Sequence, residues 1–344
     1  MIRPVRLTDL VEMRRLPYAR IDLRNEITLA GSHRPLGFAL RCALPFGHDR
    51  HTVVYQDHGL RGYVQGVCRP NTAEADLLYL AAQPLHHGVR QPTDPDVWHH
   101  LLSDFIGRMG SRQIERIYAP LPSNSSSDEV FRQLGFQSYA NRQVWRALTP
   151  DVAEGSAIIA LRPQQRRDPY AIHRLYEAIT PAPVIRFEGR TARSWQLPVV
   201  RSRPNGVRQR SWVLGRDGRD DVLRAAIHVW QGRFAAVISL LIDPAERGLA
   251  SAVLRFGLTQ VATAHQGAVY VLLPEYHGEL GHDLAEIGFE HLGDQRLTVK
   301  TTTVALRKPL LRPVLEGSLE IITRPSVSSA VQRSDTESPP SPLV

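Results

Sequence analysis

Two adjacent residues, Tyr276 and His277, are candidates for acid–base chemistry. They follow the apolar run 268–273, which has the character of a buried strand. A histidine titrates near neutrality and a phenol can hold or give up a proton, so the pair could serve as acid or base. The alternative is that a histidine at the end of a strand caps it or lies at the surface.

A second candidate is the segment 183–210, which is unusually basic. It holds seven arginines and a single acidic residue, Glu188. The arginines are Arg186, Arg190, Arg193, Arg201, Arg203, Arg208 and Arg210. An acidic ligand, a phosphate group or a nucleic acid could use such a segment, and so could a loop that is merely solvated. Basic and aromatic residues do not alternate in it, which makes nucleic-acid binding a minority hypothesis.

Composition limits the class of protein. The chain has 344 residues, 42% of them hydrophobic and 22% charged, which excludes a wholly disordered, fibrous or membrane-spanning protein. The net charge is +8, and only Lys300 and Lys308 among the 42 basic residues are lysines. This excess favours an anionic partner, although the use of arginine in place of lysine can also reflect genome composition. Two cysteines and no apolar leader predict a cytoplasmic protein.

The sequence contains an internal repeat. Arg3, Pro4 and Asp9 recur 159 residues later as Arg162, Pro163 and Asp168, and a Gly-Phe pair at Gly135 recurs 153 residues later at Gly288. These two offsets indicate a duplicated unit of roughly 155 residues. We therefore expect domains at residues 1–150 and 151–324. The tail 325–344, with ten Pro or Ser in twenty residues, is expected to be disordered.

The order of predicted elements is the same in both halves. We expect, in the first, a helix at 7–16, a hairpin at 51–67, a strand at 76–82, a helix around 98–109, a strand at 114–121, a helix at 127–134 and paired strands at 136–148. The second repeats this with a strand at 158–161, a helix at 170–179, strands at 210–214, 222–230 and 234–242, a helix at 245–265, a strand at 268–273, a helix at 282–287 and final strands at 293–306. Apolar strands flanked by helices predict a sheet covered on both faces.

This element order resembles the GNAT N-acyltransferase superfamily, and two such units resemble a tandem GNAT protein. The resemblance covers residues 1–324 and implies an α/β fold: two GNAT-like domains, each with a mostly antiparallel central sheet and helices on both faces. It also implies an acetyl-CoA donor and an amine acceptor, which could be a small molecule or a peptide. The acceptor itself, the acyl chain and the oligomeric state do not follow from it.

The same resemblance implies an acyl-CoA site in the second half. In the family, a glycine-containing loop and the following helix N-terminus hold the pyrophosphate with backbone amides. Gly248 and Ala250 match that loop, whereas Ala245 stands where Gln or Arg is usual and the loop is about two residues short. The expected cofactor-binding residues are Leu241, Ile242, Arg247, Gly248, Leu249, Ala250 and Ser251. The alternative is a capped helix, with Asp243 as cap, Pro244 in the first turn, Glu246 closing a capping box and Gly248 packed on the sheet.

The family's tyrosine acid is missing from both halves, since Phe131 and Leu284 occupy its position. Tyr276 and His277 are therefore the expected catalytic residues. The equivalent loop of the first half, 83–92, lacks the second small residue, which predicts a structural copy there. Two further hypotheses stay open: a catalytically inactive GNAT-fold binding or scaffold module, and a nucleic-acid-binding protein that uses residues 183–210. No metal site is expected, because His86, His87, His99 and His100 lack accompanying ligands.

Overall fold

The computed structural model describes residues 1–15, 19–31, 34–44, 49–70, 72–83, 95–123, 127–148, 159–197, 207–216, 219–262 and 267–302. The expected domain boundary between residues 150 and 151 and the expected disordered tail at 325–344 lie outside the described residues, as do His86 and His87. Residues 1–305 form one compact unit by their contacts.

The first half contains a series of strands and helices that matches most of the predicted order. They are β1 (Ile2–Pro4), α1 (Asp9–Arg15), β2 (Ala19–Asp22), α2 (Glu26–Ala30), α3 (Pro35–Ala43), β3 (Arg50–Gln56), β4 (Leu60–Cys68), β5 (Glu74–Ala82), α4 (Pro95–Ser111), β6 (Arg116–Pro122), α5 (Asp128–Gln133) and β7 (Gln137–Ala147). The sequence analysis predicted no element between α1 and β3, where the structure has β2, α2 and α3.

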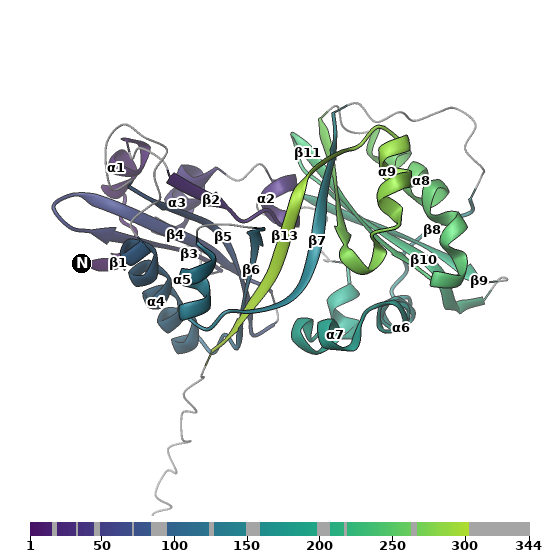
Figure 1. Ribbon diagram of the computed structural model, residues 1–344, viewed down its shortest axis with the longest axis horizontal. Helices are drawn as coiled ribbons and strands as arrows, with labels where there is room; N and C mark the ends of the chain where they lie inside the picture. Colours follow the sequence, from purple (N-terminus) through teal and green to yellow (C-terminus); the bar gives the residue numbers. More distant parts are fainter. Residues whose placement is uncertain are drawn as a thin grey trace, which may run out of the picture. The chain divides into compact units, whose positions relative to one another are not determined.

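The second half repeats the order (Figure 1). Its elements are β8 (Arg162–Pro163), α6 (Pro169–Ile179), α7 (Ala182–Glu188), the 3₁₀ helix η1 (Ala192–Trp195), β9 (Arg208–Arg216), β10 (Arg219–Gln231), β11 (Ala235–Ile242), η2 (Pro244–Leu249), α8 (Ala250–Ala262), β12 (Ala268–Pro274), η3 (Glu275–His277), α9 (Leu280–Glu286) and β13 (Glu290–Thr301).

Four predicted elements were wrong in detail. The helix expected at 245–265 is interrupted: η2 comes first, Glu246 has non-helical dihedral angles, and α8 begins only at Ala250. The paired strands expected at 136–148 and the final strands at 293–306 are each one long strand, β7 and β13. A strand was expected at 158–161, but residues 159–161 are not in a strand, and the two-residue β8 follows at Arg162–Pro163. Each long strand finds its partners in the other half, which local sequence cannot reveal.

The described strands form one mixed sheet in which the halves exchange their last strands. The order is β1-β3-β4-β5-β6-β13-β7-β12-β11-β10-β9-β8, with β2 paired to β5. β13, from the end of the chain, pairs antiparallel with β6 of the first half, and β7 pairs antiparallel with β12 of the second. β7 and β13 also pair with each other, side by side in the middle of Figure 1. Each half is therefore completed by a strand of the other.

Helices cover both faces of the sheet, as the apolar strands predicted. In the first half, α4 and α5 pack on one face through a cluster that includes Phe105 and Phe131, while α1 and α3 cover the other through Met13 and Phe38. In the second half, α8 and α9 cover one face, and α6 with η1 covers the opposite one. The apolar residues of α6 recur at three- and four-residue intervals, so they form a single buried stripe.

The repeated Arg-Pro motif has a structural reason. In the first half both terminal nitrogens of Arg3 donate to the two carboxylate oxygens of Asp9, at 2.6 and 2.8 Å, and Asp9 also accepts the amide of Arg6. Arg162 binds Asp168 in the same way, at 2.7 and 2.9 Å, with the amide of Gln165. The motif thus fastens the first strand of each half to the start of its first helix.

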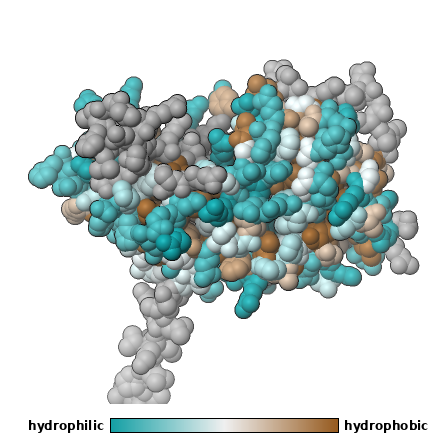
Figure 2. Space-filling view, in the orientation of Figure 1, coloured by the Kyte–Doolittle hydropathy of each residue, from teal (hydrophilic) through white to brown (hydrophobic). Residues whose placement is uncertain are grey.

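Among the described residues, no helix is both long and apolar enough to cross a bilayer. The face shown in Figure 2 is mostly hydrophilic, with hydrophobic residues in small groups between hydrophilic ones. Surfaces of folded proteins commonly retain such scattered apolar groups.

Candidate functional site

The predicted cofactor-binding residues lie where two parallel strands separate. β11 pairs with β12 from Ala235–Ala268 to Ile238–Val271 and no further, although β11 continues to Ile242 and β12 to Pro274. Leu241 and Ile242, at the end of β11, are buried on opposite faces of the sheet. The chain then passes through η2 into α8, where Arg247, Gly248, Leu249, Ala250 and Ser251 lie.

Asp243 caps this turn, in part as the helix-start alternative predicted. Its carboxylate accepts the amide of Ala245 at 3.0 Å, and its carbonyl accepts the amide of Glu246. Glu246 does not close the capping box that was expected; its carboxylate instead pairs with Arg224 at 2.6 Å. Since these two amides are already bonded, they are not available to bind phosphate.

Gly248 and Arg247 are the open positions of this turn. A Cβ atom built on Gly248 would meet nothing within 4 Å, so the expectation that this glycine packs against the sheet was wrong. The side chain of Arg247 is 60% exposed and pairs with Glu279 at 3.3 Å. Space at Gly248 and a solvent-accessible guanidinium beside it suit an anionic group.

Tyr276 and His277 lie in η3, directly after β12, with their ring centroids 4.9 Å apart. His277 is buried, and its Nε2 atom is among the buried polar atoms that have no partner in the described structure. Desolvation lowers the pKa of His277, with Glu279 and Arg247 acting in opposite directions on it. Burial raises the pKa of Tyr276, and so does the nearby charge of Glu188. At neutral pH, His277 is therefore an uncharged acceptor and Tyr276 a protonated donor.

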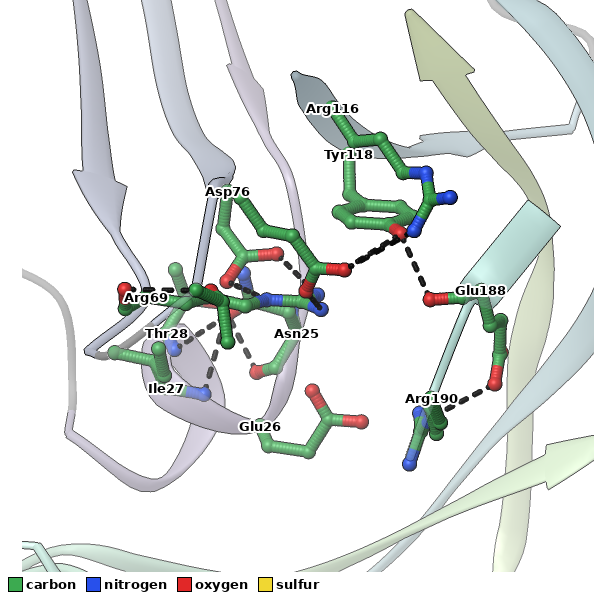
Figure 3. A network of polar contacts seen from close by, with 12 residues as sticks. Asn25, Glu26, Ile27, Thr28, Arg69, Asp76, Arg116, Tyr118, Glu188 and Arg190 are labelled. Atoms are coloured by element: carbon green, nitrogen blue, oxygen red, sulfur yellow. Dashed lines mark hydrogen bonds and ion pairs between the residues drawn. The ribbon is translucent and has the colours of Figure 1, made fainter. Parts of the chain in front are cut away.

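One arginine of the basic segment 183–210 belongs to a set of charged side chains drawn from both halves (Figure 3). We call it the central polar cluster, and its members are Glu26, Arg69, Glu74, Asp76, Arg116, Tyr118, Arg142, Glu188 and Arg190. It lies where β4, β5, β6 and the start of α2 meet the end of α7. Four arginines and four carboxylates balance its charge.

Arg69 and Tyr118 anchor the cluster on the first half. Arg69 donates to both oxygens of Asp76, at 2.9 and 2.7 Å, and to Glu74 at 2.8 Å, while its guanidinium lies 4.3 Å from the centre of the Tyr118 ring. The hydroxyl of Tyr118 lies 3.1 and 3.0 Å from the carbonyl oxygens of Phe187 and Glu188. The end of α7 is thereby fastened to β6.

Gly189 lets the chain turn at this point. It ends α7 in the left-handed conformation, with φ of 56°, and a Cβ atom there would lie 2.0 Å from Nη1 of Arg116. The residues on either side of it, Glu188 and Arg190, form an ion pair at 2.7 Å. Tyr176 donates to the same carboxylate of Glu188 at 2.9 Å.

Arg190 connects the cluster to aromatic rings of the second half. Its guanidinium carbon lies 5.2 Å from the ring centre of Trp195 and 5.7 Å from that of Tyr176. The ring of Trp195 also stacks on that of His228, and the two ring centroids are 5.3 Å apart. Desolvation and the charge of Arg190 lower the pKa of His228 to about 4, so this buried imidazole is neutral.

Solved structures identify the fold. A GCN5-related N-acetyltransferase from Sphaerobacter thermophilus superposes with a TM-score of 0.50 at 14% identity, over 88% of this chain and 95% of that one. The chain has the GNAT fold. A tandem GNAT protein from the clavulanic acid biosynthesis pathway aligns with a TM-score of 0.45 at 13% identity, over 89% and 99% of the two chains. A putative acetyltransferase from Pyrococcus horikoshii aligns with a TM-score of 0.46 at 13% identity, over 88% and 90%. The sequence matches no family model and no curated protein.

Within this GNAT fold, the residues at the family's tyrosine position are part of the core. Phe131 and Leu284 are each 1% exposed, and the Phe131 ring contacts that of Phe136 at 4.9 Å. Neither can be replaced by a side chain that reaches the solvent without disturbing the packing.

Other candidates from the sequence do not join the site. The two cysteines offer no reactive thiolate either: burial raises the pKa of Cys42 to about 11 and also raises that of Cys68, so both are thiols at neutral pH. His99 and His100 lie on α4, and the described residues contain no group of three or more ligands for a metal. A cavity of about 530 Å³, lined by Gln137, Ala182, Pro183, Arg186 and Phe187, contains none of the predicted cofactor-binding residues.

Most of the central polar cluster was not predicted from the sequence. Glu26, Tyr118 and Arg142 come from three separate elements, Arg69 directly follows β4, and none of the four lies in a motif. Arg190 was noticed only as one of seven arginines in a segment. A signal existed in Gly189, because a glycine between two oppositely charged residues after an apolar helix indicates a left-handed turn that presents both of them.

Proposed function

We propose that the protein is an N-acyltransferase that moves an acetyl group from acetyl-CoA to an amine, by direct attack in a ternary complex. The observation that carries the proposal is the separation of β11 from β12 after Ile238 and Val271 in a GNAT fold. It frees the ends of two adjacent parallel strands immediately before η2 and η3, which hold the candidate binding and proton-transfer residues. Ligands of open sheets favour such strand ends.

In the second half, Arg247 and the open space at Gly248 would bind the diphosphate of acetyl-CoA. The exposed guanidinium of Arg247 supplies charge, and a side chain at Gly248 would occupy open space. Leu249, Ala250 and Ser251 complete the turn into α8, and Leu241 and Ile242 form the adjoining strand end. Fewer amides serve than in the usual family loop, because Ala245 and Glu246 donate to Asp243.

Tyr276 and His277 suit opposite roles in the transfer. The donor supplies a thioester carbonyl whose leaving group has a thiol pKa of roughly 8.5. The neutral Nε2 of His277 can accept the proton that the attacking amine loses as the C–N bond forms. The protonated phenol of Tyr276 can donate to the departing thiolate as the C–S bond breaks.

The first half serves as a structural partner and forms one side of the site proposed to bind the acceptor. α2 packs on β11, where Ala30 lies in one buried cluster with Val237 and Leu272. β7 lies beside β12. An acceptor that approaches the strand ends would therefore meet residues of both halves.

Calorimetric titration with acetyl-CoA tests the proposal directly. We expect saturable heat from the wild-type protein and loss of binding in Gly248→Trp, because a bulky side chain would fill the space at the turn. Gly107→Trp is the matched control, since Gly107 in α4 also has nothing within 4 Å of a Cβ atom. Absence of heat above the dilution blank for the wild type contradicts the proposal.

One observation favours a second candidate, an inactive GNAT-fold binding module. Both tyrosine positions are apolar core residues, and two amides of the short loop are already used. Release of free thiol from acetyl-CoA, measured with a panel of amines, separates the two. Amine-dependent release that falls in His277→Gln excludes the inactive module.

A further inference from the structure

The central polar cluster contains one carboxylate with little pairing, Glu26. Glu74 and Asp76 are bound by Arg69, and Glu188 is bound by Arg190 and Tyr176, all at 2.9 Å or less. The sole ion pair of Glu26 among the described residues is a 3.4 Å contact with Arg142. Its side chain remains 30% exposed, and Figure 3 shows the carboxylate directed into the space between Arg69 and Arg190.

Of the three arginines that act on Glu26, one has unused donors. The arginines that act on Glu26 are Arg142, Arg190 and Arg69. Arg69 uses all three of its nitrogens on Glu74 and Asp76, and Arg142 uses all three on Gln295, Glu26 and the carbonyl of Arg24. Arg190 engages only Nε, with Glu188, so within the described part of the chain its two terminal nitrogens have no partner.

Arg190 is nevertheless held in place. Trp195 and Tyr176 lie near its guanidinium, and the ion pair with Glu188 fixes its Nε edge. The side chain is 39% exposed, so the terminal nitrogens are open to a ligand. A positioned guanidinium with two parallel donors matches the geometry of a carboxylate or a similar oxyanion.

We propose that the space between Glu26 and Arg190 binds a small zwitterion, with its ammonium group on Glu26 and its acidic group on Arg190. A purely anionic ligand would approach the Glu26 carboxylate, and a purely cationic one would approach Arg190, so each would meet repulsion. A ligand with both charges satisfies both spare groups while the cluster stays neutral.

This assignment deepens the proposed function, on which its catalytic meaning rests: the acceptor class becomes amines that also carry an acidic group. Tyr276 lies within electrostatic range of both Glu188 and Arg190, which relates the cluster to the proposed proton donor. Residues of both halves would then recognise the acceptor, Glu26 from the first and Arg190 from the second.

The test uses the full-length protein without acyl-CoA and a series of ω-amino acids: glycine, β-alanine, 4-aminobutyrate, 5-aminovalerate and 6-aminohexanoate. We expect calorimetric binding with a maximum at the chain length that spans Glu26 and Arg190. The alkylamine and the alkanoate of matching length, which each lack one charge, should bind about tenfold more weakly or worse. These comparisons use the wild-type protein, so folding of variants does not affect them.

Two substitutions assign the ends of the ligand. Glu26→Gln should weaken binding of the zwitterion and the alkylamine about tenfold and leave the alkanoate unchanged, whereas Arg190→Gln should weaken the zwitterion and the alkanoate only. Glu12→Gln and Arg208→Gln, at exposed residues, are the charge-matched controls.

Absence of binding by every member of the series overturns the assignment, as does binding that neither cluster variant alters. Because no acyl donor is present, these outcomes are independent of the proposed acetyl transfer. If acetyl-CoA gives no heat but the zwitterion binds with the expected pattern, only the proposed function fails.

Discussion

Arg142 and Gln295 are hydrogen-bonded to each other, at 3.0 Å, and are also opposite each other in the β7–β13 pairing. They are 153 residues apart, the offset that relates Gly135 to Gly288, so they hold equivalent positions in the two halves. Equivalent residues of the two halves are therefore paired at this point, so β7 and β13 are related by a pseudo-twofold axis that passes between Arg142 and Gln295. Arg142 carries the contact onward, to Glu26 and the carbonyl of Arg24.

Loss of Arg142 should be costly. The side chain is 9% exposed and bonds to three groups, so Arg142→Ala leaves buried polar atoms without a partner. We expect the free energy of unfolding to fall by about 3 kcal/mol, measured by urea denaturation. Arg146→Ala, on the same strand, is the control: its pair with Glu290 is exposed, and its loss should cost under about 1 kcal/mol. Equal effects of the two substitutions would show that Arg142 does not stabilise the pairing of β7 with β13.

The two Arg-Asp motifs should make stability depend on pH in the acid range. Burial alone would raise the pKa of Asp9 and of Asp168, but the paired arginine, the backbone amide bonded to each carboxylate and nearby charges together hold both pKa values below the ordinary value. A carboxyl whose pKa is depressed by folding stabilises the protein above its unfolded pKa of about 3.9, and this stabilisation is lost as the pH falls through the folded value.

We therefore expect the urea concentration at the unfolding midpoint of the wild type to decrease when the pH is lowered below about 4. In Asp9→Asn/Asp168→Asn, the midpoint should already be lower at pH 7 and should change less on acidification. Since the motifs have the same geometry, each single substitution should account for a similar share. An unchanged acid dependence in the double variant would contradict the assignment.

Protonation of His277 should make the rate of acetyl transfer fall at low pH, which gives the pH–rate profile an acid limb. Desolvation lowers the pKa of His277, so the imidazole is neutral and able to accept a proton at pH 7. The rate should fall as the pH drops below the ordinary histidine value of about 6.5. In His277→Gln, kcat/KM should fall about 100-fold and the limb should disappear. Substitution of the exposed His282 in α9 is the control and should leave the profile intact. Retention of the limb in His277→Gln assigns the titration to another group.

The exchange of β7 and β13 should prevent the halves from folding separately. Alone, the first half would lack β13 beside β6, and its own β7 would have no partner strand. We expect fragments 1–153 and 154–344, expressed together, to purify as a complex, and either fragment alone to aggregate because its sheet edge is unpaired. Size-exclusion chromatography distinguishes these cases. Elution of either fragment as a folded monomer would contradict the expectation.

Short-range patterns in the sequence specify the local elements and the repeat. Apolar periodicity located α4, α6 and most strands, and the recurrence of Arg3, Pro4 and Asp9 at Arg162, Pro163 and Asp168 marked the same fastening in each half. The fold class follows from that order, because helices and strands are specified by short-range spacing. The residues proposed for acyl-CoA and proton transfer also came from the sequence, and their roles stay predictions.

Which strands pair across the halves, and which charged side chains meet, depends on the folding of the whole chain. Nothing near β7 in the sequence indicates that its partners are β12 and β13, because strand pairing depends on long-range packing. Glu26, Arg69 and Arg190 are likewise far apart in the chain. They come together because Glu26 contacts Arg142 of β7, while Tyr118 of β6 contacts Arg69 and bonds the carbonyl of Glu188 beside the Gly189 turn. Charged side chains carry no periodic signal, so their meeting place appears only when the chain is folded.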